Sequence, residues 1–196
     1  YIGATHGVDS MNSRLKRERD DVIHFNRSKP RPVVDSATKD YMQLLNANSY
    51  QKGAWCLHML RNLLGPDVFM QGIRAYYKRY AGSNASTDDF RKVMEEVSGK
   101  DLKLFFNQWL YTPGLPVLQV SHSYDAQKNI LLIRINQQQA KAFAFPLEVE
   151  IRTAKGSLKK VFQVTKAAEQ FSIPGTGQVS EVMLDPGVKL LFERIF

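Results

Sequence analysis

The sequence predicts an α+β fold in two parts, a helical bundle-like segment followed by a small antiparallel β-sandwich. Apolar residues recur every three or four positions as far as the segment 111–116, Tyr-Thr-Pro-Gly-Leu-Pro, and every second position after it. We therefore divide the chain into residues 1–112, the helical part, and residues 113–196, the sandwich. A length of 196 residues is enough for a real hydrophobic core.

The helical part is expected to contain five helices and one long connector. The first helix runs from around Val8 to Arg27 and stops before Lys29-Pro30-Arg31-Pro32. Residues 30–48 form an extended connector with one helical turn near Tyr41–Leu45. A connector of this length inside a compact domain is usually functional or wraps a neighbouring surface.

The second helix is expected to run from Tyr50 to Leu64, where Gly65 ends it. Asn48 or Ser49 can cap its free N–H groups. One face at helical spacing is expected to point inward, with Trp55 and Met59 beside it: Gly53, Cys56, Leu57, Leu60, Leu63 and Leu64.

Three further helices have clear starts. Pro66 suits the first position of a helix whose inner face carries Phe69, Ile73, Tyr76, Tyr77 and Tyr80. Ser86-Thr87-Asp88-Asp89 is a capping-box pattern, and Asp101 is expected to cap the last helix. Short loops between these helices indicate antiparallel neighbours.

The second part alternates like strands. Phe143, Phe145, Leu147, Val149 and Ile151 are separated by Ala144, Pro146, Glu148 and Glu150. Six more segments follow the same pattern: 117–124, 130–136, 158–164, 170–173, 179–184 and 188–196. Turn formers separate them, including Lys155-Gly156-Ser157. Seven short strands at this spacing favour a sandwich, and Pro146 indicates an edge or a bulge.

The composition excludes several classes of function. The net charge is +8, but basic residues exceed acidic ones by seventeen to twelve in residues 1–112 and by ten to seven in residues 113–196. This even spread indicates dispersed surface charge rather than a nucleic-acid track. No apolar run is long enough to span a membrane. Cys56, the single cysteine, excludes an internal disulfide and reads as a buried small hydrophobe rather than a nucleophile.

No metal or nucleophile motif stands out. The histidines His6, His24, His58 and His122 are far apart, and none belongs to an H-E-x-x-H pattern. Asp20 and Asp21 lie near His24, but on a charged helix that reads as plain surface. His58 could approach a site but reads as a surface residue of a polar stripe, and His122 reads as a strand side chain.

Tyr50 is the candidate catalytic residue. It lies where a polar loop turns into a mostly apolar helix, and a neutral O–H donor there is useful where an oxygen gains negative charge. On the pattern alone, a tyrosine packed beside a helix cap for structural reasons is the commoner case.

The segment 48–55, Asn-Ser-Tyr-Gln-Lys-Gly-Ala-Trp, resembles the tyrosine segment of the M1 family of zinc aminopeptidases. Later segments resemble the consecutive helices of the family's catalytic domain: Leu64–Phe69, Ile73–Tyr77, Thr87–Phe90 and Phe106–Trp109. The strand region ending Leu184-Asp185-Pro186-Gly187 resembles the β-sandwich domain that follows. The resemblance covers nearly all of residues 1–112.

The resemblance implies a thermolysin-like catalytic domain that removes N-terminal residues from peptides. One zinc ion, held by H-E-x-x-H and a downstream glutamate, would activate water, with the motif glutamate as base. Tyr50 matches the tyrosine that stabilises the tetrahedral oxyanion. Zinc ligands, general base and N-terminus-recognising motif have no match here. They are expected before Tyr1, in a missing N-terminal part of the same protein, so the chain alone is expected to bind no catalytic zinc and to be inactive.

Two alternatives stay open. Some relatives keep the helical body and the sandwich as a non-catalytic interaction scaffold, although a retained Tyr50 argues against this interpretation. Others open an epoxide, an activity that relies on features outside this chain. Gln51 stands where many members carry glutamate, a mild change beside the phenol.

Overall fold

The computed structural model describes residues 2–154 and 156–196, so Tyr1 and Lys155 of the predicted turn lie outside the described residues. The chain forms two compact units. One is Lys29–Pro113, which is helical, and the other joins Gly114–Phe196 to the residues up to Ser28. The expected α+β class is confirmed, since helices and two β-sheets account for most of the chain.

The unit Lys29–Pro113 contains seven helical segments in its described residues. They are η1 Tyr41–Leu44, η2 Asn48–Lys52, α2 Gly53–Leu64, α3 Pro66–Tyr80, α4 Thr87–Ser98, α5 Lys103–Phe106 and η3 Asn107–Tyr111. Two predicted starts are confirmed: Pro66 opens α3, and Ser86 and Asp89 form a reciprocal capping box at α4. The cap expected at Asp101 is off by one residue, because Leu102 occupies the N-cap position of α5, although the Asp101 carboxylate accepts a hydrogen bond from the backbone N–H of Lys103.

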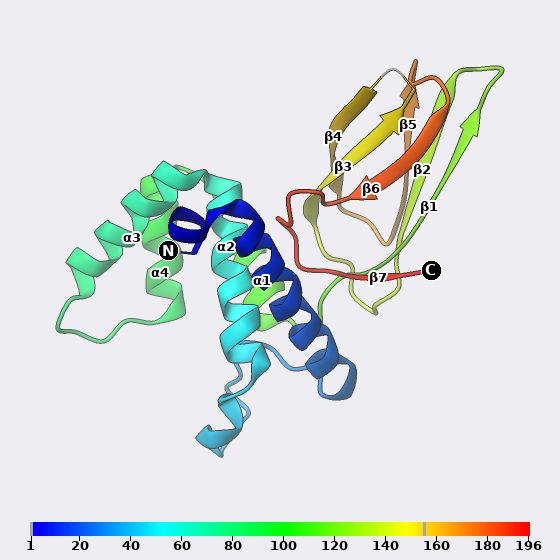
Figure 1. Ribbon diagram of the computed structural model, residues 1–196. Helices are drawn as coiled ribbons and strands as arrows, with labels where there is room; N and C mark the ends of the chain where they lie inside the picture. The colour runs from blue at the N-terminus through cyan, green and yellow to red at the C-terminus, as the bar shows by residue number, and fades with distance from the viewer. Residues whose placement is uncertain (1, 155) are drawn as a thin grey trace. The chain divides into compact units, whose positions relative to one another are not determined.

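The core of this unit lies between α2, α3, α4 and α5, which lie close together in Figure 1. Its buried members are Leu60, Leu64, Phe69, Met94, Leu102 and Phe106. Gly72 lets α3 and α4 approach, because a Cβ there would lie 2.3 Å from the Met94 sulfur. Tyr77, expected on the inner face of α3, is instead 75% exposed.

The buried face of α2 differs from the expected one. Leu57 and Leu63 are exposed, whereas Trp55 and Met59, expected only at the margin, are buried with Cys56, Leu60 and Leu64. A helix buries only one stripe of its surface, and the larger Trp55 and Met59 side chains occupy the margin of that stripe here. Helical spacing alone does not determine whether Trp55 and Met59 or Leu57 and Leu63 are buried at the edge of this stripe.

The first helix, α1 Ile2–Ser28, confirms the predicted helix over Val8–Arg27 and continues beyond it toward the N-terminus. Gly7 interrupts it with φ 82° and ψ 166°, a backbone conformation that glycine adopts without steric penalty. Arg27 forms an ion pair with Glu193, and the Arg19 guanidinium lies 5.5 Å from the centre of the Phe192 ring. These contacts connect α1 to the end of the strand region.

The described residues form seven strands, as predicted. The strands are arranged in two sheets, which Figure 1 shows as two layers. They are β1 Val117–Asp125, β2 Ile130–Gln137, β3 Phe145–Thr153, β4 Gly156–Val164, β5 Ala168–Pro174, β6 Val179–Leu184 and β7 Glu193–Ile195. The sheet orders are β5-β2-β1-β7 and β4-β3-β6. Alternate side chains of β2 and β3 are buried between them, with Leu147, Val149 and Ile151 fully enclosed.

Two details refine the expected antiparallel sandwich. β7 pairs with β1 in parallel, and the other strand pairs are antiparallel. Pro146 lies in the first half of β3, which pairs with β4 on one side only. The pairing of β3 with β6 begins further along, at Val149. The missing N–H of Pro146 is tolerated because this end of the central strand is an edge.

The predicted division into residues 1–112 and 113–196 stays a prediction. Its break falls within one residue of the change from one compact unit to the other at Pro113, but α1 groups with the strands. Within residues 2–154 and 156–196, no helix combines the length and the apolar character that crossing a bilayer requires.

Candidate functional site

Tyr50 lies in η2, a single π-helical turn that leads directly into α2. The Asn46 side chain closes its N-terminal end, since Oδ1 accepts hydrogen bonds from the N–H groups of Asn48 at 2.9 Å and of Ser49 at 3.2 Å. The predicted cap, Asn48 or Ser49, is therefore wrong, because the capping side chain is that of Asn46. The helical hydrogen bonds begin before the apolar pattern, since the turn η2 precedes α2. Isolated π-turns of this kind frequently mark functional sites.

The Tyr50 side chain is 62% exposed, on the outer side of this turn. Its backbone is fixed, because its N–H donates to the Asn46 carbonyl at 3.1 Å and its carbonyl accepts from the N–H of Gly53. The phenol is therefore accessible, and its ring is not enclosed by the helix. Tyr50 lines none of the hollows described below. Its catalytic role stays a prediction.

Lys52, two residues further on, is fully buried. Burial lowers the pKa of its ammonium group from 10.5 to about 8, and the nearby Cys56 thiol partly opposes this shift. A lysine almost never lies fully inside a protein without a reason. Sequence reasoning missed Lys52, since a lysine at the start of an amphipathic helix reads as surface.

Asn48 is the second buried polar residue of the turn, with 2% of its surface exposed. Its Nδ2 donates hydrogen bonds to the carbonyl oxygens of Arg31 at 2.9 Å and Pro32 at 2.7 Å. Asn48 thus ties the turn to the connector. The sequence singled out Asn48 only as a possible cap, because nothing local indicates a partner sixteen residues away.

Cys56 is buried, as expected. Burial raises the pKa of its thiol to about 12, with the charge of Lys52 acting in the opposite direction. Its Sγ lies 3.8 Å from the carbonyl oxygen of Trp109. A thiol with so high a pKa is a poor nucleophile at neutral pH. The structural role expected for Cys56 is supported by this environment.

The histidines do not come together. His6, His24 and His122 are exposed, and His58 is half-buried against the Trp55 ring and beside Asn62. In the described part of the chain, no group of three or more histidine, cysteine, aspartate or glutamate side chains could hold a metal ion.

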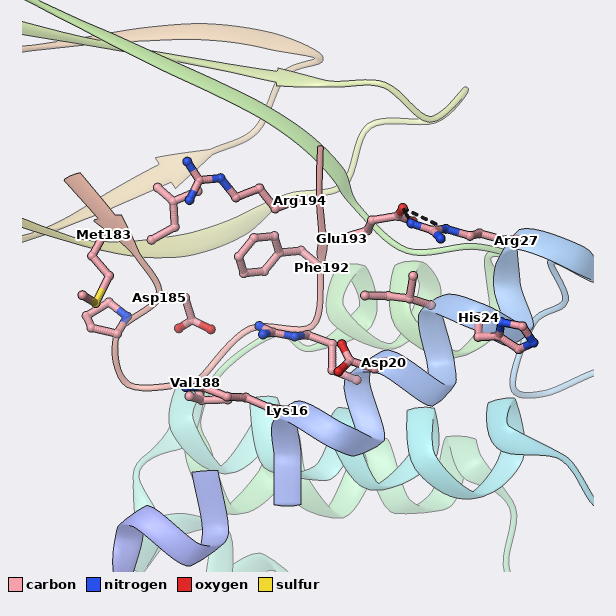
Figure 2. A pocket seen from close by; sticks show the side chains of 14 residues that line it. Lys16, Asp20, His24, Arg27, Met183, Asp185, Val188, Phe192, Glu193 and Arg194 are labelled. Atoms are coloured by element: carbon pink, nitrogen blue, oxygen red, sulfur yellow. Dashed lines mark hydrogen bonds and ion pairs between the residues drawn. The ribbon is translucent and has the colours of Figure 1, made fainter. Parts of the chain in front are cut away.

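Hollows of about 560, 290 and 250 Å³ in the described part of the chain lie outside the Tyr50 turn. An apolar one of about 290 Å³ is bounded by α2, α3, α4 and α5. A polar one of about 560 Å³ lies between α1 and the segment Met183–Arg194, and Figure 2 shows Asp20 and His24 at its wall. Asp20 and His24, expected as plain surface, are exposed but line this hollow.

Opposite charges line the polar hollow. Figure 2 shows the Arg27–Glu193 ion pair on one side. Asp185 is buried, and burial raises the pKa of its carboxyl to about 6, although the N–H groups of Lys189 and Leu190 donate to it. Arg27 and Glu193 thus neutralise one another, and the hydrogen bonds to Asp185 hold the segment Asp185–Leu190 in place.

Comparison with known proteins identifies the helical region. The sequence model described as the peptidase family M1 domain matches residues 5–109, which include η2 and α2. The chain is 30% identical over 143 residues to a glutamyl aminopeptidase of Bitis rhinoceros, covering 71% of this chain and 15% of that protein. It is 28% identical over 140 residues to aminopeptidase N of Escherichia coli strain K12, covering 62% of this chain and 16% of that protein.

The fold is also similar to a solved structure. The crystal structure of Legionella pneumophila aminopeptidase A in complex with aspartic acid superposes with a TM-score of 0.77 at 17% identity, covering 99% of this chain and 22% of that one. The matches thus span about one-seventh to one-fifth of the length of these relatives. Because the family match covers more than half of the sequence and includes the Tyr50 turn, the chain belongs to peptidase family M1.

Proposed function

We propose that the chain is part of a zinc-dependent aminopeptidase that hydrolyses N-terminal residues from peptides, and that Tyr50 donates a hydrogen bond to the reacting carbonyl. Two observations support this proposal: the family match includes residues 48–55, and the relatives are named as aminopeptidases. The observation that carries the role of Tyr50 is its exposed phenol on a turn whose backbone is held by hydrogen bonds.

The chemistry proposed for Tyr50 is electrostatic. When water adds to a peptide carbonyl, negative charge develops on its oxygen, and a fixed neutral O–H donor stabilises that oxyanion more than the substrate. The phenol keeps its proton throughout. Its backbone is already anchored before substrate arrives, which reduces the reorganisation needed during the reaction.

The side chains that bind the zinc ion of the proposed enzyme would belong to the N-terminal part of the same protein. The described residues do not provide a suitable ligand group, so no step through a metal is assigned to them. We therefore propose that the 196-residue chain alone hydrolyses no peptide, and that its first partner is that N-terminal part. The substrate is a peptide with a free N-terminus.

Substitution of Tyr50 tests this proposal in the full-length protein. Tyr50→Phe removes only the hydroxyl and is expected to lower kcat by about 100- to 1000-fold, with little change in KM. The measurement is the hydrolysis of aminoacyl chromogenic substrates. Tyr77→Phe, at a tyrosine of α3 that is 75% exposed, is the control and should retain wild-type kcat. If Tyr50→Phe also retained it, the proposed role of Tyr50 would be wrong, whereas a wild-type protein without measurable kcat would favour the scaffold alternative.

A further inference from the structure

We propose that Asn48 is a positioning residue, which holds Tyr50 in its working orientation by tying η2 to the connector at Arg31 and Pro32. This inference rests on the proposed role of Tyr50. It concerns a side chain that does not itself reach substrate, because Asn48 is buried.

The Asn48 side chain has one possible orientation. Both of its neighbours, the carbonyl groups of Arg31 and Pro32, are acceptors, so the amide must present its NH₂ group to them. Both amide hydrogens are then used, whereas its own Oδ1 is buried with no partner in the described part of the chain. The side chain therefore serves as a double donor.

The two carbonyls lie in a stretch that depends on outside donors. Pro30 and Pro32 have no N–H, and each restricts the residue before it to an extended backbone. The connector is also held at Val34, whose N–H donates to the Leu110 carbonyl at 2.9 Å. Arg31 and Pro32 thus belong to a fixed strip of backbone against which Asn48 can hold the turn.

The direction of the side chains links Asn48 to Tyr50. In a helical turn, residues four apart share a face, and the residue midway between them points the opposite way. Asn48 and Lys52 are accordingly the two buried residues of η2, and Tyr50 between them is the exposed one. Anchoring the inner face at Asn48, with Lys52 buried at its other end, keeps the outer residue in one orientation.

Long-range and local contacts have different effects here. The bonds from Asn48 and Ser49 to Asn46 join near neighbours, so they set the shape of the turn. The bonds from Asn48 to Arg31 and Pro32 span seventeen and sixteen residues, so they set where the turn lies in the unit. Loss of Asn48 is expected to leave the turn formed but displaced.

The test is Asn48→Ala in the full-length protein. Because a displacement of about 1 Å can reduce catalysis about 100-fold, we expect kcat to fall by about 10- to 100-fold with KM nearly unchanged. The matched control is Asn26→Ala in α1, because Asn26 is also buried and also donates to a backbone carbonyl, that of Val22. The control should lose stability without the selective loss in kcat.

A double-mutant cycle separates positioning from general destabilisation. If Asn48 acts through Tyr50, Asn48→Ala should add little to the loss already caused by Tyr50→Phe. Full additivity of the two losses, or an unchanged kcat in Asn48→Ala, would overturn the inference. If Tyr50→Phe had no effect, the proposed function itself would fail, which is a distinguishable result. Should Asn48→Ala not fold, Asn48→Ser retains a hydroxyl donor and is expected to show the same pattern with a smaller loss.

Discussion

The strand sandwich and the Tyr50 turn handle buried polar groups in opposite ways. In the sandwich, the buried Gln137 uses its whole amide: Nε2 donates to the carbonyls of Phe143 and Lys166, and Oε1 accepts from the N–H of Phe143. Around the turn, Asn48 Oδ1, Gln51 Oε1 and Trp55 Nε1 are buried without a partner in the described part of the chain, and Lys52 is enclosed nearby.

This difference indicates what each region is selected for. Burying a polar atom without a partner costs free energy, so a region optimised only for stability avoids it. The sandwich follows that rule, with alternating apolar side chains and satisfied polar ones. The turn departs from it at three atoms close together, and α1 departs from it at Asn12 Oδ1 and Asn26 Oδ1. Departures of this kind are expected more often at functional sites. The predictions below test the two regions against each other.

The largest effect is expected for the reactivity of Cys56. A pKa of about 12 instead of 9.0 reduces the thiolate fraction about 1000-fold at pH 8. Alkylation by iodoacetamide should therefore be slower by at least about that factor in the native protein than after unfolding. Mass spectrometry of a sample of this chain measures the rate cleanly, because it contains a single cysteine. Equal alkylation rates in the native and the unfolded protein would show that Cys56 is accessible to the reagent in the folded state.

A core truncation should have the next largest effect, in the sandwich. Leu147 of β3 is fully buried, and Leu147→Ala is expected to lower the free energy of unfolding by about 2–5 kcal/mol. Leu158→Ala, on the exposed part of β4, should cost much less. Denaturant unfolding measures both. We expect kcat per folded molecule to stay unchanged, and a large drop in kcat would contradict the contrast between the regions.

The pH dependence of stability should reveal Lys52. Between about pH 8 and pH 10.5 the unfolded chain binds a proton on Lys52 that the folded chain does not, so folding stability rises with pH in this window. Compared with Lys52→Met, the wild-type free energy of unfolding should gain about 3 kcal/mol across it. Lys78→Met, at an exposed lysine of α3, is the control. If the difference in free energy of unfolding between wild type and Lys52→Met did not change with pH, the Lys52 amine would be hydrated in the folded protein.

The smallest effect is expected at a helix cap. Ser86 and Asp89 cap α4 reciprocally, so Ser86→Ala should lower the free energy of unfolding by about 1 kcal/mol. Ser49→Ala should cost less, since the Ser49 side chain makes no cap hydrogen bond at η2. Thermal unfolding of both variants compares the cap at Ser86, which the sequence predicts correctly, with the cap at Ser49, which the sequence predicts wrongly.

The sequence was most informative where structure depends on near neighbours. The start of α3 at Pro66, the capping box at Ser86 and the end of α2 at Gly65 each follow from residues within one turn. Six of the seven strand segments were also found to within two residues at each end, because alternation reflects a sheet with one buried face. The last strand was overestimated: pairing covers only Glu193–Ile195 of the expected 188–196.

The candidate site was only partly accessible to sequence reasoning. Tyr50 could be singled out from the segment 48–55, but its exposure, the π-turn and the burial of Lys52 could not. The same limit explains the error at Leu57 and Leu63. Whether a helix turns Leu57 or Trp55 inward depends on which other helices pack against it, and spacing within one helix does not contain that information.

The sequence by itself determined where most of the helices and strands lie, together with membership of peptidase family M1 through residues 5–109. Only the tertiary structure decided which polar side chains became buried and what they hold. The physical reason is distance along the chain. Caps and alternation act over two to four residues, whereas the bonds from Asn48 to Arg31 and Pro32 exist only once residues seventeen and sixteen positions apart have been brought together by folding.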